Sequence, residues 1–270
     1  MTQILLDEDK IGINDLHENS QITKIEIPGK YSALPSRLFE YFISLIQVTF
    51  KKQSNLLYIY IYEYAFNGCI QLQQIKIPSP VKTIGYYAFV ECRSLKEITI
   101  PASVESIGSD AFENCTGLKI VKILSTFLDK FESRMFCGCS SLKEFEIPSS
   151  VTLIGDDCFK GCSSLISIKI PSNVISIRAS AFSYCSSLKE ITLLSYKSSE
   201  NAKISSSLTT IGTVALSKCV SLIELKVPST VTSVDKDAFD GCSSLQEILL
   251  PSISKKKQMP VQRLPEFKMI

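Results

Sequence analysis

The chain has 270 residues, of which 45% are hydrophobic and 21% charged, and its formal net charge is +2. This near-neutral balance gives no reason to expect nucleic acid or an acidic polymer as a partner. The first ten residues, MTQILLDEDK, are acidic where an export signal would be basic, and the chain has no apolar run of about 18 residues, so we expect neither an export signal nor a membrane span.

The first elements, between Ile11 and Phe50, follow a repeat that is still irregular in this part of the chain. Ile11-Gly12 marks the end of one extended segment, residues 22–28 read ITKIEIP, and residues 45–50 read LIQVTF. Apolar residues at alternate positions in such short runs predict β-strands with one buried face. The terminal units of a repeat protein face solvent on one side and are often degenerate, so we predict that residues 1–18 form an N-terminal cap.

From Cys69 to Cys185 the chain repeats a 23-residue frame, C-x-x-L-x-x-I-x-I-P-x-x-V-x-x-I-G-x-x-A-F-x-x. A period of this length indicates a solenoid, in which each unit forms one coil and stacks on the next. The I-x-I-P part predicts a short strand that ends at proline, which has no N–H for a sheet, and V-x-x-I predicts a second extended segment. We interpret the glycine that follows as a turn residue with positive φ, and A-F-x-x-C as long enough for one helical turn at most. These glycines are Gly85, Gly108, Gly155 and Gly212.

Two irregularities interrupt the frame before the chain leaves it. The unit between Cys115 and Cys139 has one extra residue near Leu128, and a polar insertion of 11 residues lies around 195–205. We predict one solenoid over residues 19–251 with a surface loop near 195–205, followed by a basic C-terminal tail or cap over residues 252–270. The predicted fold is mainly β, with about ten turns: parallel short strands on the concave side, and short extended segments and single helical turns opposite.

Eight of the ten cysteines recur in phase with the repeat, at intervals of 23 or 24 residues apart from one interval of 34. They are Cys69, Cys92, Cys115, Cys139, Cys162, Cys185, Cys219 and Cys242. An inward-facing position must recur once per coil, so we interpret these residues as a column of buried thiols. Disulfide bridges remain the alternative, because neighbouring coils lie about 4.8 Å apart, within bridging range. The out-of-phase Cys137 and Cys158 are predicted to be exposed, reactive thiols.

No motif in the chain points to a reaction. The single histidine, His17, lies in the degenerate first unit without an orienting acid or an oxyanion motif beside it in the sequence. The cysteines form no C-x-x-C pair, and no glycine-rich phosphate-binding sequence occurs. We therefore predict no catalytic residue, no cofactor and no metal ion.

The positions that the coil leaves free are those flanking the first isoleucine of I-x-I. The residue before it and the residue after it form two columns, the first mostly acidic and the second mostly basic. We predict that these side chains line the concave sheet as parallel rows and bind a protein; the alternative is a solvated face with weak ion pairs. The candidate binding residues are Gln74, Lys76, Glu97, Thr99, Lys122, Glu144, Glu146, Lys169, Glu190, Thr192, Glu224, Lys226 and Glu247.

The repeated frame resembles the BspA-like leucine-rich repeats, which occur in surface antigens of oral bacteria and parasitic protozoa. The resemblance is clearest from Ile147 to Leu188, IPSSVTLIGDDCFKGCSSLISIKIPSNVISIRASAFSYCSSL, and extends from about Ile11 to Pro251. It implies a leucine-rich-repeat solenoid that acts as a non-catalytic binding scaffold, often an adhesin for host or matrix proteins. The resemblance favours the cell surface, whereas the missing export signal favours the cytoplasm. The alternatives are therefore an intracellular scaffold for protein–protein interactions and, less favoured, an enzyme whose site is not recognised.

Overall fold

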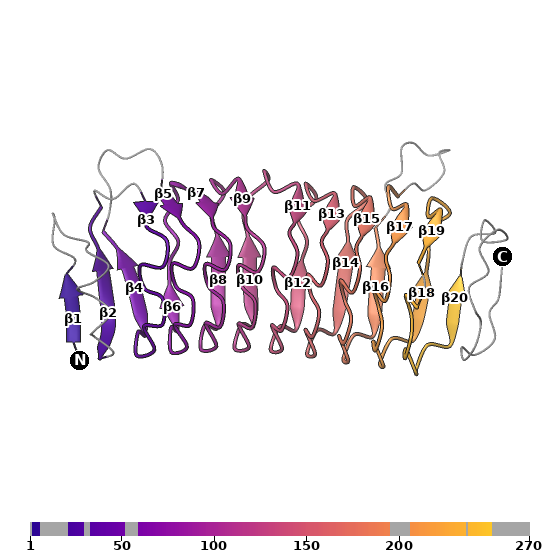
Figure 1. Ribbon diagram of the computed structural model, residues 1–270. Coiled ribbons are helices and arrows are strands. Elements are labelled where there is room, and N and C mark those ends of the chain that lie inside the picture. Colours follow the sequence, from indigo (N-terminus) through magenta and orange to yellow (C-terminus); the bar gives the residue numbers. More distant parts are fainter. Residues whose placement is uncertain are drawn as a thin grey trace. The chain divides into compact units, whose positions relative to one another are not determined.

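The computed structural model describes residues 2–5, 21–29, 33–51, 59–194, 206–235 and 237–249. The chain divides into two compact units, an N-terminal unit of residues 1–128 and 135–141 and a C-terminal unit of residues 129–134 and 142–270. The described residues of both units form strands and turns and no helix (Figure 1). The predicted loop near 195–205 and the predicted tail over 252–270 lie outside the described residues.

The N-terminal unit has two kinds of parallel strand, one from each extended segment of the repeat. The I-x-I strands are β1 (Thr2–Leu5), β2 (Ile22–Ile27), β4 (Gln47–Phe50) and β6 (Gln74–Ile75), which pair in that order, and β8 (Glu97–Ile100), which pairs with β10 (Ile120–Ile123). The V-x-x-I strands are β3 (Ala33–Leu34), β5 (Ile59–Ile61), β7 (Val81–Ile84) and β9 (Ser106–Ile107), which form a second sheet. Thus β1, in the segment predicted as a cap, adds a strand to the first sheet.

The C-terminal unit repeats this arrangement with two five-stranded parallel sheets. Its I-x-I strands are β12 (Glu144–Glu146), β14 (Ser167–Ile170), β16 (Glu190–Leu193), β18 (Glu224–Lys226) and β20 (Glu247–Leu249). Its V-x-x-I strands are β11 (Lys130–Phe131), β13 (Leu153–Ile154), β15 (Ser176–Ile177), β17 (Thr210–Ile211) and β19 (Ser233–Val234). Alternate strands in the sequence are neighbours in a sheet, so each coil contributes one strand to each sheet. The predicted solenoid of parallel strands is confirmed.

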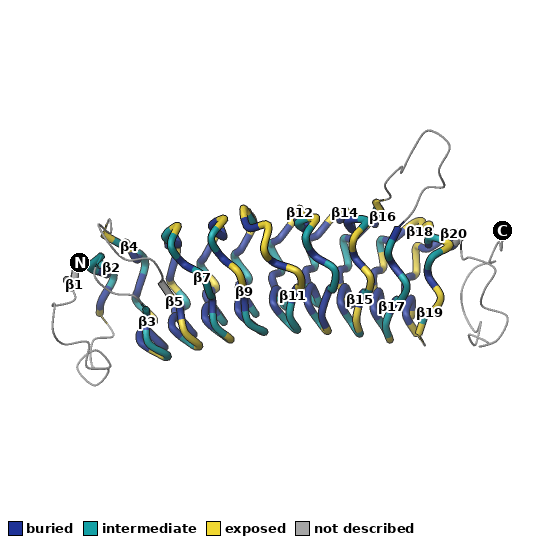
Figure 2. Tube along the Cα trace, turned by 90° about the horizontal axis from the view of Figure 1, so that it is seen from above, coloured by how far each residue is buried: buried dark blue, intermediate teal, exposed yellow. Residues whose placement is uncertain are grey.

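The interior of each coil is filled by the apolar positions of the frame, and buried residues alternate with exposed ones along the trace (Figure 2). The phenylalanine of A-F forms a continuous stack in the N-terminal unit. The rings of Phe66 and Phe89 lie 5.1 Å apart, and those of Phe89 and Phe112 lie 5.3 Å apart, with interplanar angles of 11° and 4°. In the C-terminal unit Phe159 and Phe182 stack in the same way at 5.3 Å. Each ring is buried only because the next coil covers it, so the coils stabilise one another.

The turn that carries A-F stops short of a helix. Two residues of each turn adopt positive φ, as at Tyr87 (57°) and Glu91 (59°), and hydrogen bonds within the turn span three residues. The amide N–H groups of Tyr87, Phe89 and Glu91 instead donate to carbonyl oxygens of the following coil. The turns thus form a third hydrogen-bonded ladder beside the two sheets.

The interpretation of the V-x-x-I-G glycines as positive-φ residues is wrong. The glycines with positive φ are Gly68, Gly138, Gly161 and Gly241, near the cysteine, among the residues that the structure describes. At Gly108 a Cβ atom would lie 2.6 Å from the backbone nitrogen of Tyr86 in the preceding coil. Glycine is needed there because the backbones of two coils approach too closely for any side chain.

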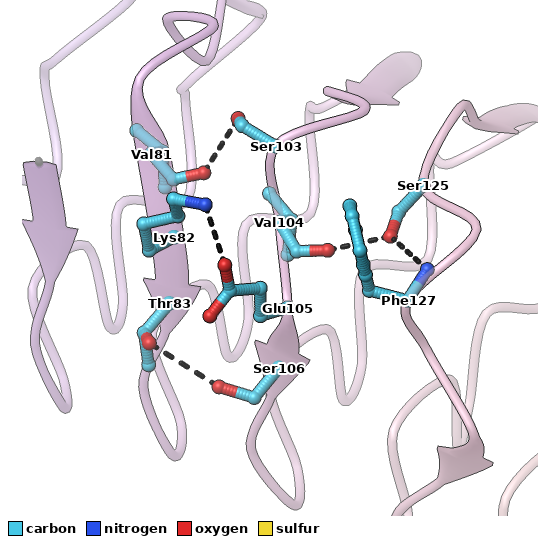
Figure 3. Close-up of polar contacts among 9 residues, drawn as sticks. All are labelled: Val81, Lys82, Thr83, Ser103, Val104, Glu105, Ser106, Ser125 and Phe127. Carbon is cyan, nitrogen blue, oxygen red and sulfur yellow. Dashed lines mark hydrogen bonds and ion pairs between the residues drawn. The ribbon is translucent and has the colours of Figure 1, made fainter. Parts of the chain in front are cut away.

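Polar side chains also connect successive coils on the V-x-x-I side. Figure 3 shows the hydroxyl of Ser103 donating to the carbonyl oxygen of Val81 and the hydroxyl of Ser125 donating to that of Val104. The Ser125 hydroxyl in turn accepts a hydrogen bond from the amide of Phe127. These bonds satisfy carbonyl groups that the short strands leave unpaired.

Candidate protein-binding face

The predicted binding residues lie on the outward side of the I-x-I strands, where the strand register aligns them. In the C-terminal unit the first row follows the pairing of Glu144 with Ser167, Ser167 with Glu190, Glu190 with Glu224, and Glu224 with Glu247. The second row follows the pairing of Glu146 with Lys169 and Lys169 with Thr192, and of Lys226 with Leu249. The structure thus brings the predicted residues of this unit together in two parallel rows.

The N-terminal unit has shorter rows with less charge. Gln74 pairs with Gln47, and β8 pairs Glu97 with Ile120 and Thr99 with Lys122. Lys76 is exposed and directly follows β6. Ile120, which stands where most other coils have Glu or Gln, is 46% exposed, so this part of the row is apolar.

The charges on these rows are solvated and only locally paired. Lys226 Nζ lies 2.9 Å from a carboxylate oxygen of Glu224, and the two side chains are 72% and 46% exposed. The hydroxyl of Thr192 donates to Glu190 over 2.7 Å. Ion pairs this exposed contribute about 0–1 kcal/mol each to stability. The rows therefore add little to the stability of the fold.

The residues between the rows belong to the core. Phe145, Ile168, Ile191 and Leu225 alternate with the row residues along β12, β14, β16 and β18, and each is at most 7% exposed. The period of two in a strand separates the faces completely. A substitution in a row can therefore change the surface without disturbing the interior.

The cysteine column is buried and unbridged. All ten cysteines are free thiols, and the eight in-phase residues are each at most 2% exposed. The thiols of Cys92 and Cys115 donate to the carbonyl oxygens of Phe66 and Phe89 in the preceding coil, over 3.3 and 3.1 Å. The column of buried thiols is thus confirmed, with a hydrogen-bonding role that the sequence did not reveal.

The two out-of-phase cysteines differ from the prediction of exposed thiols. Cys158 is fully buried because it occupies the alanine position of the A-F pair, beside Phe159, and points into the coil. Cys137 is half-buried. For Cys158 the prediction is therefore wrong.

Burial disfavours the thiolate and raises the pKa of five column cysteines, Cys69, Cys92, Cys115, Cys219 and Cys242. Loss of solvation raises the pKa of Cys115 to about 12 and that of Cys242 to about 11, partly opposed by hydrogen bonds from backbone groups. A thiol with so high a pKa is a poor nucleophile at neutral pH. These cysteines therefore serve the interior of the fold.

We expect the free energy of unfolding to fall as the pH rises from about 8.5 towards 11. The thiols of the unfolded chain ionise near pH 8.5 and those of the folded chain only at higher pH. Their contribution to the free energy of unfolding is therefore fully present below pH 8.5 and is lost progressively as the pH rises above it. The loss is roughly 1 kcal/mol per buried thiol per pH unit. Denaturant titrations at pH 7 and pH 10 measure it. Cys115→Ser, which removes one thiol, is expected to show a smaller pH dependence, and equal slopes for the two proteins would contradict the assignment.

The sequence reasoning missed a second group of exposed side chains, the tyrosines of the N-terminal unit. Eight of the ten tyrosines lie between Tyr31 and Tyr87, a bias in composition that could have revealed them.

His17 lies outside the described residues. In the part of the chain that the structure describes, no group of three or more His, Cys, Asp or Glu side chains could hold a metal ion. No helix within the described ranges is long and apolar enough to cross a membrane.

Comparison with known proteins places the repeat in a defined group. The model of the BspA type leucine rich repeat region matches in six copies over residues 9–129, 59–189 and 195–259. No curated protein matches the chain. A leucine rich cell surface protein from Faecalibacterium prausnitzii is similar in structure, with 24% identity, 94% of this chain and 78% of that chain covered, and a TM-score of 0.46. A leucine-rich repeat protein from Bacteroides ovatus is 23% identical, with 93% of this chain and 84% of that chain covered and a TM-score of 0.40. A leucine-rich repeat protein from T. pallidum is 22% identical, with 90% of this chain and 77% of that chain covered and a TM-score of 0.43.

Proposed function

The chain belongs to the BspA type leucine-rich repeat family, and from this we propose that it is a non-catalytic protein-binding scaffold. The observation that carries the proposal is the pair of side-chain rows on the I-x-I strands, above all the row containing Glu144, Glu190 and Glu224. Parallel strands hold these side chains at a regular spacing of about 4.8 Å on a rigid support. Repeat proteins present binding residues in this way, on extended surfaces instead of in pockets.

The mixed charge of the rows favours a protein as the partner. Complementary charges on two protein surfaces fix the register of a complex and exclude wrong partners. A surface for nucleic acid would carry one sign of charge with interleaved aromatic rings, whereas these rows carry both signs. The finer form of the proposal, an adhesin or surface antigen that recognises host or matrix proteins, rests on the family resemblance.

Reversing three charges of the first row tests the proposal. We expect the variant Glu144→Lys, Glu190→Lys, Glu224→Lys to keep its fold, because these residues are exposed and the core between the rows is unchanged. Its affinity for a bound protein is expected to fall about tenfold or more, since each lost charge contact contributes up to about 1 kcal/mol. Binding is measured against a panel of purified matrix proteins and of proteins from the chain's own cells.

A matched control makes the same change of charge away from the rows, at Asp156, Asp235 and Asp240 of the same unit, which are all exposed. The control is expected to bind as the unmodified chain does. Equal affinity of the row variant and the control would move the binding site off this face. If no protein of the panel binds, the result would contradict the proposal that the chain is a protein-binding scaffold.

A further inference from the structure

The N-terminal unit carries exposed tyrosines away from its I-x-I face. Four of them have large exposed fractions: Tyr41 (64%), Tyr60 (37%), Tyr62 (45%) and Tyr86 (56%). At the position of Tyr86 the next coils carry Ser109 and Ser133, and the C-terminal unit carries Asp156. The repeat therefore does not require an aromatic ring at this position, and the concentration of rings in one unit calls for another explanation.

These rings are held in fixed orientations. Tyr60 and Tyr62 stack with centroids 5.9 Å apart and an interplanar angle of 15°. Tyr86 stands beside Glu63 in the next coil, because β5 and β7 pair in register up to two residues before each of them. A tyrosine that is already fixed loses little conformational entropy when a partner binds, which is why rigid tyrosines dominate many binding surfaces.

One tyrosine of the same turns already binds a cation within the molecule. The guanidinium carbon of Arg37 lies 4.1 Å from the centroid of the Tyr64 ring, and that ring also stacks on Tyr87 at 4.8 Å. Arg37 is held there by two hydrogen bonds to the buried carboxylate of Glu40. This contact shows the geometry in which a guanidinium group fits the tyrosines of this surface.

The surface around the rings has an excess of negative charge. The turn and V-x-x-I segments of this unit, residues 33–42, 60–68, 81–93 and 104–117, contain six carboxylates and three cationic side chains. Each cation contacts a carboxylate: Arg37 with Glu40, Lys82 with Glu105 (Figure 3), and Arg93 with Glu91. Glu63, which stands between Tyr62 and Tyr64 in the sequence, is exposed and has no ion-pair partner among the described residues. The charge therefore favours a cationic ligand.

We propose that the tyrosine surface formed by Tyr60, Tyr62 and Tyr86 with Glu63 docks an arginine-bearing segment of a protein partner. Aromatic faces attract cations, and the planar guanidinium group stacks on them better than the compact ammonium group of lysine does. Glu63 supplies the opposite charge. The surface is separate from the rows of the I-x-I strands and does not depend on their function.

Fluorescence anisotropy with labelled octa-arginine, octa-lysine and octa-glutamate peptides tests the proposal on the full chain. We expect octa-arginine to bind more tightly than octa-lysine, and octa-glutamate not to bind. The variant Tyr62→Ser, Tyr86→Ser is expected to weaken octa-arginine binding about tenfold or more.

Three controls separate this result from unfolding and from general charge attraction. Tyr184→Asn removes a 55% exposed tyrosine with a φ of 61° from the C-terminal unit and is expected to leave binding unchanged. Tyr62→Phe with Tyr86→Phe keeps the rings and is expected to retain binding. The variant Glu144→Lys, Glu190→Lys, Glu224→Lys is also expected to bind octa-arginine normally, which keeps the two proposals distinguishable.

The proposal is overturned if octa-arginine does not bind, if the tyrosine variant binds it unchanged, or if Tyr184→Asn lowers binding equally. Binding of neutral cellohexaose through the same tyrosines, with octa-arginine unbound, would assign the surface to sugars and would also overturn it.

Discussion

Replacing Cys115 with lysine is expected to unfold the N-terminal unit, whereas Cys115→Ser leaves it folded. The thiol is fully buried, and it donates to the carbonyl oxygen of Phe89, 3.1 Å away. A lysine at this position would place an ammonium group among apolar side chains with no opposite charge to pair with, which costs about 3–5 kcal/mol or more. Serine is of similar size and its hydroxyl can donate to the same carbonyl.

Circular dichroism and thermal unfolding of the two variants check this expectation. Lysine at an exposed position of the same unit, Glu97→Lys, is the control for added charge and is expected to melt close to the unmodified chain. A melting temperature for Cys115→Lys that matches this control would show that the cysteine column is not the interior of the fold.

Phe89→Ala is the second substitution with a large expected effect, a loss of about 3–5 kcal/mol in the free energy of unfolding. The ring is fully buried and stacks on Phe66 and Phe112, so its removal leaves a cavity that touches three coils. Denaturant unfolding followed by tyrosine fluorescence or circular dichroism measures the loss.

Two comparisons show whether the loss comes from the stack. Phe127→Ala removes a ring that is 60% exposed in the same unit and is expected to cost little. Phe89→Leu is expected to cost less than Phe89→Ala, because the chain itself places Leu216 at this position of a later coil. Equal losses for Phe89→Ala and Phe127→Ala would contradict the role of stacking.

The inward positions could be read from the sequence because the repeat fixes them. A position that recurs every 23 residues meets the same neighbours in each coil, so Phe89, Cys115 and Ile98 were placed in the interior without structural data. The same reasoning aligned Glu190 with Glu224, since parallel strands one repeat apart pair in register. Periodicity alone is sufficient for both.

Other features depend on distances between coils, which a sequence does not contain. Gly108 was assigned to a positive-φ turn, but the reason for glycine there is the backbone of Tyr86 in the preceding coil. Conversely, positive φ occurs at Tyr87 and even at Val214, residues for which this conformation is unfavourable and which no sequence rule would select. The ladder of backbone hydrogen bonds between successive turns imposes this conformation.

The extra residue near Leu128 was interpreted as an irregularity of one repeat unit. The chain first passes from the N-terminal to the C-terminal compact unit between Leu128 and Asp129, and it returns for residues 135–141. The extent of the solenoid over residues 19–251 stays a prediction. The repeat places the rows on the surface, but the binding proposed for the rows and for the tyrosine surface does not follow from it, because exposed positions are free to vary without any effect on the repeat.

The hydrogen bonds donated by the thiols of Cys92, Cys115 and Cys139 each go to a carbonyl oxygen 26 or 27 residues earlier in the chain. Each coil is thus in contact only with the coil before it and the coil after it. Duplication or deletion of one 23-residue stretch in the gene would leave each surviving residue beside partners of the same kind. Such a molecule can change its length through copying errors while its interior stays intact, and new surfaces can then arise on spare coils.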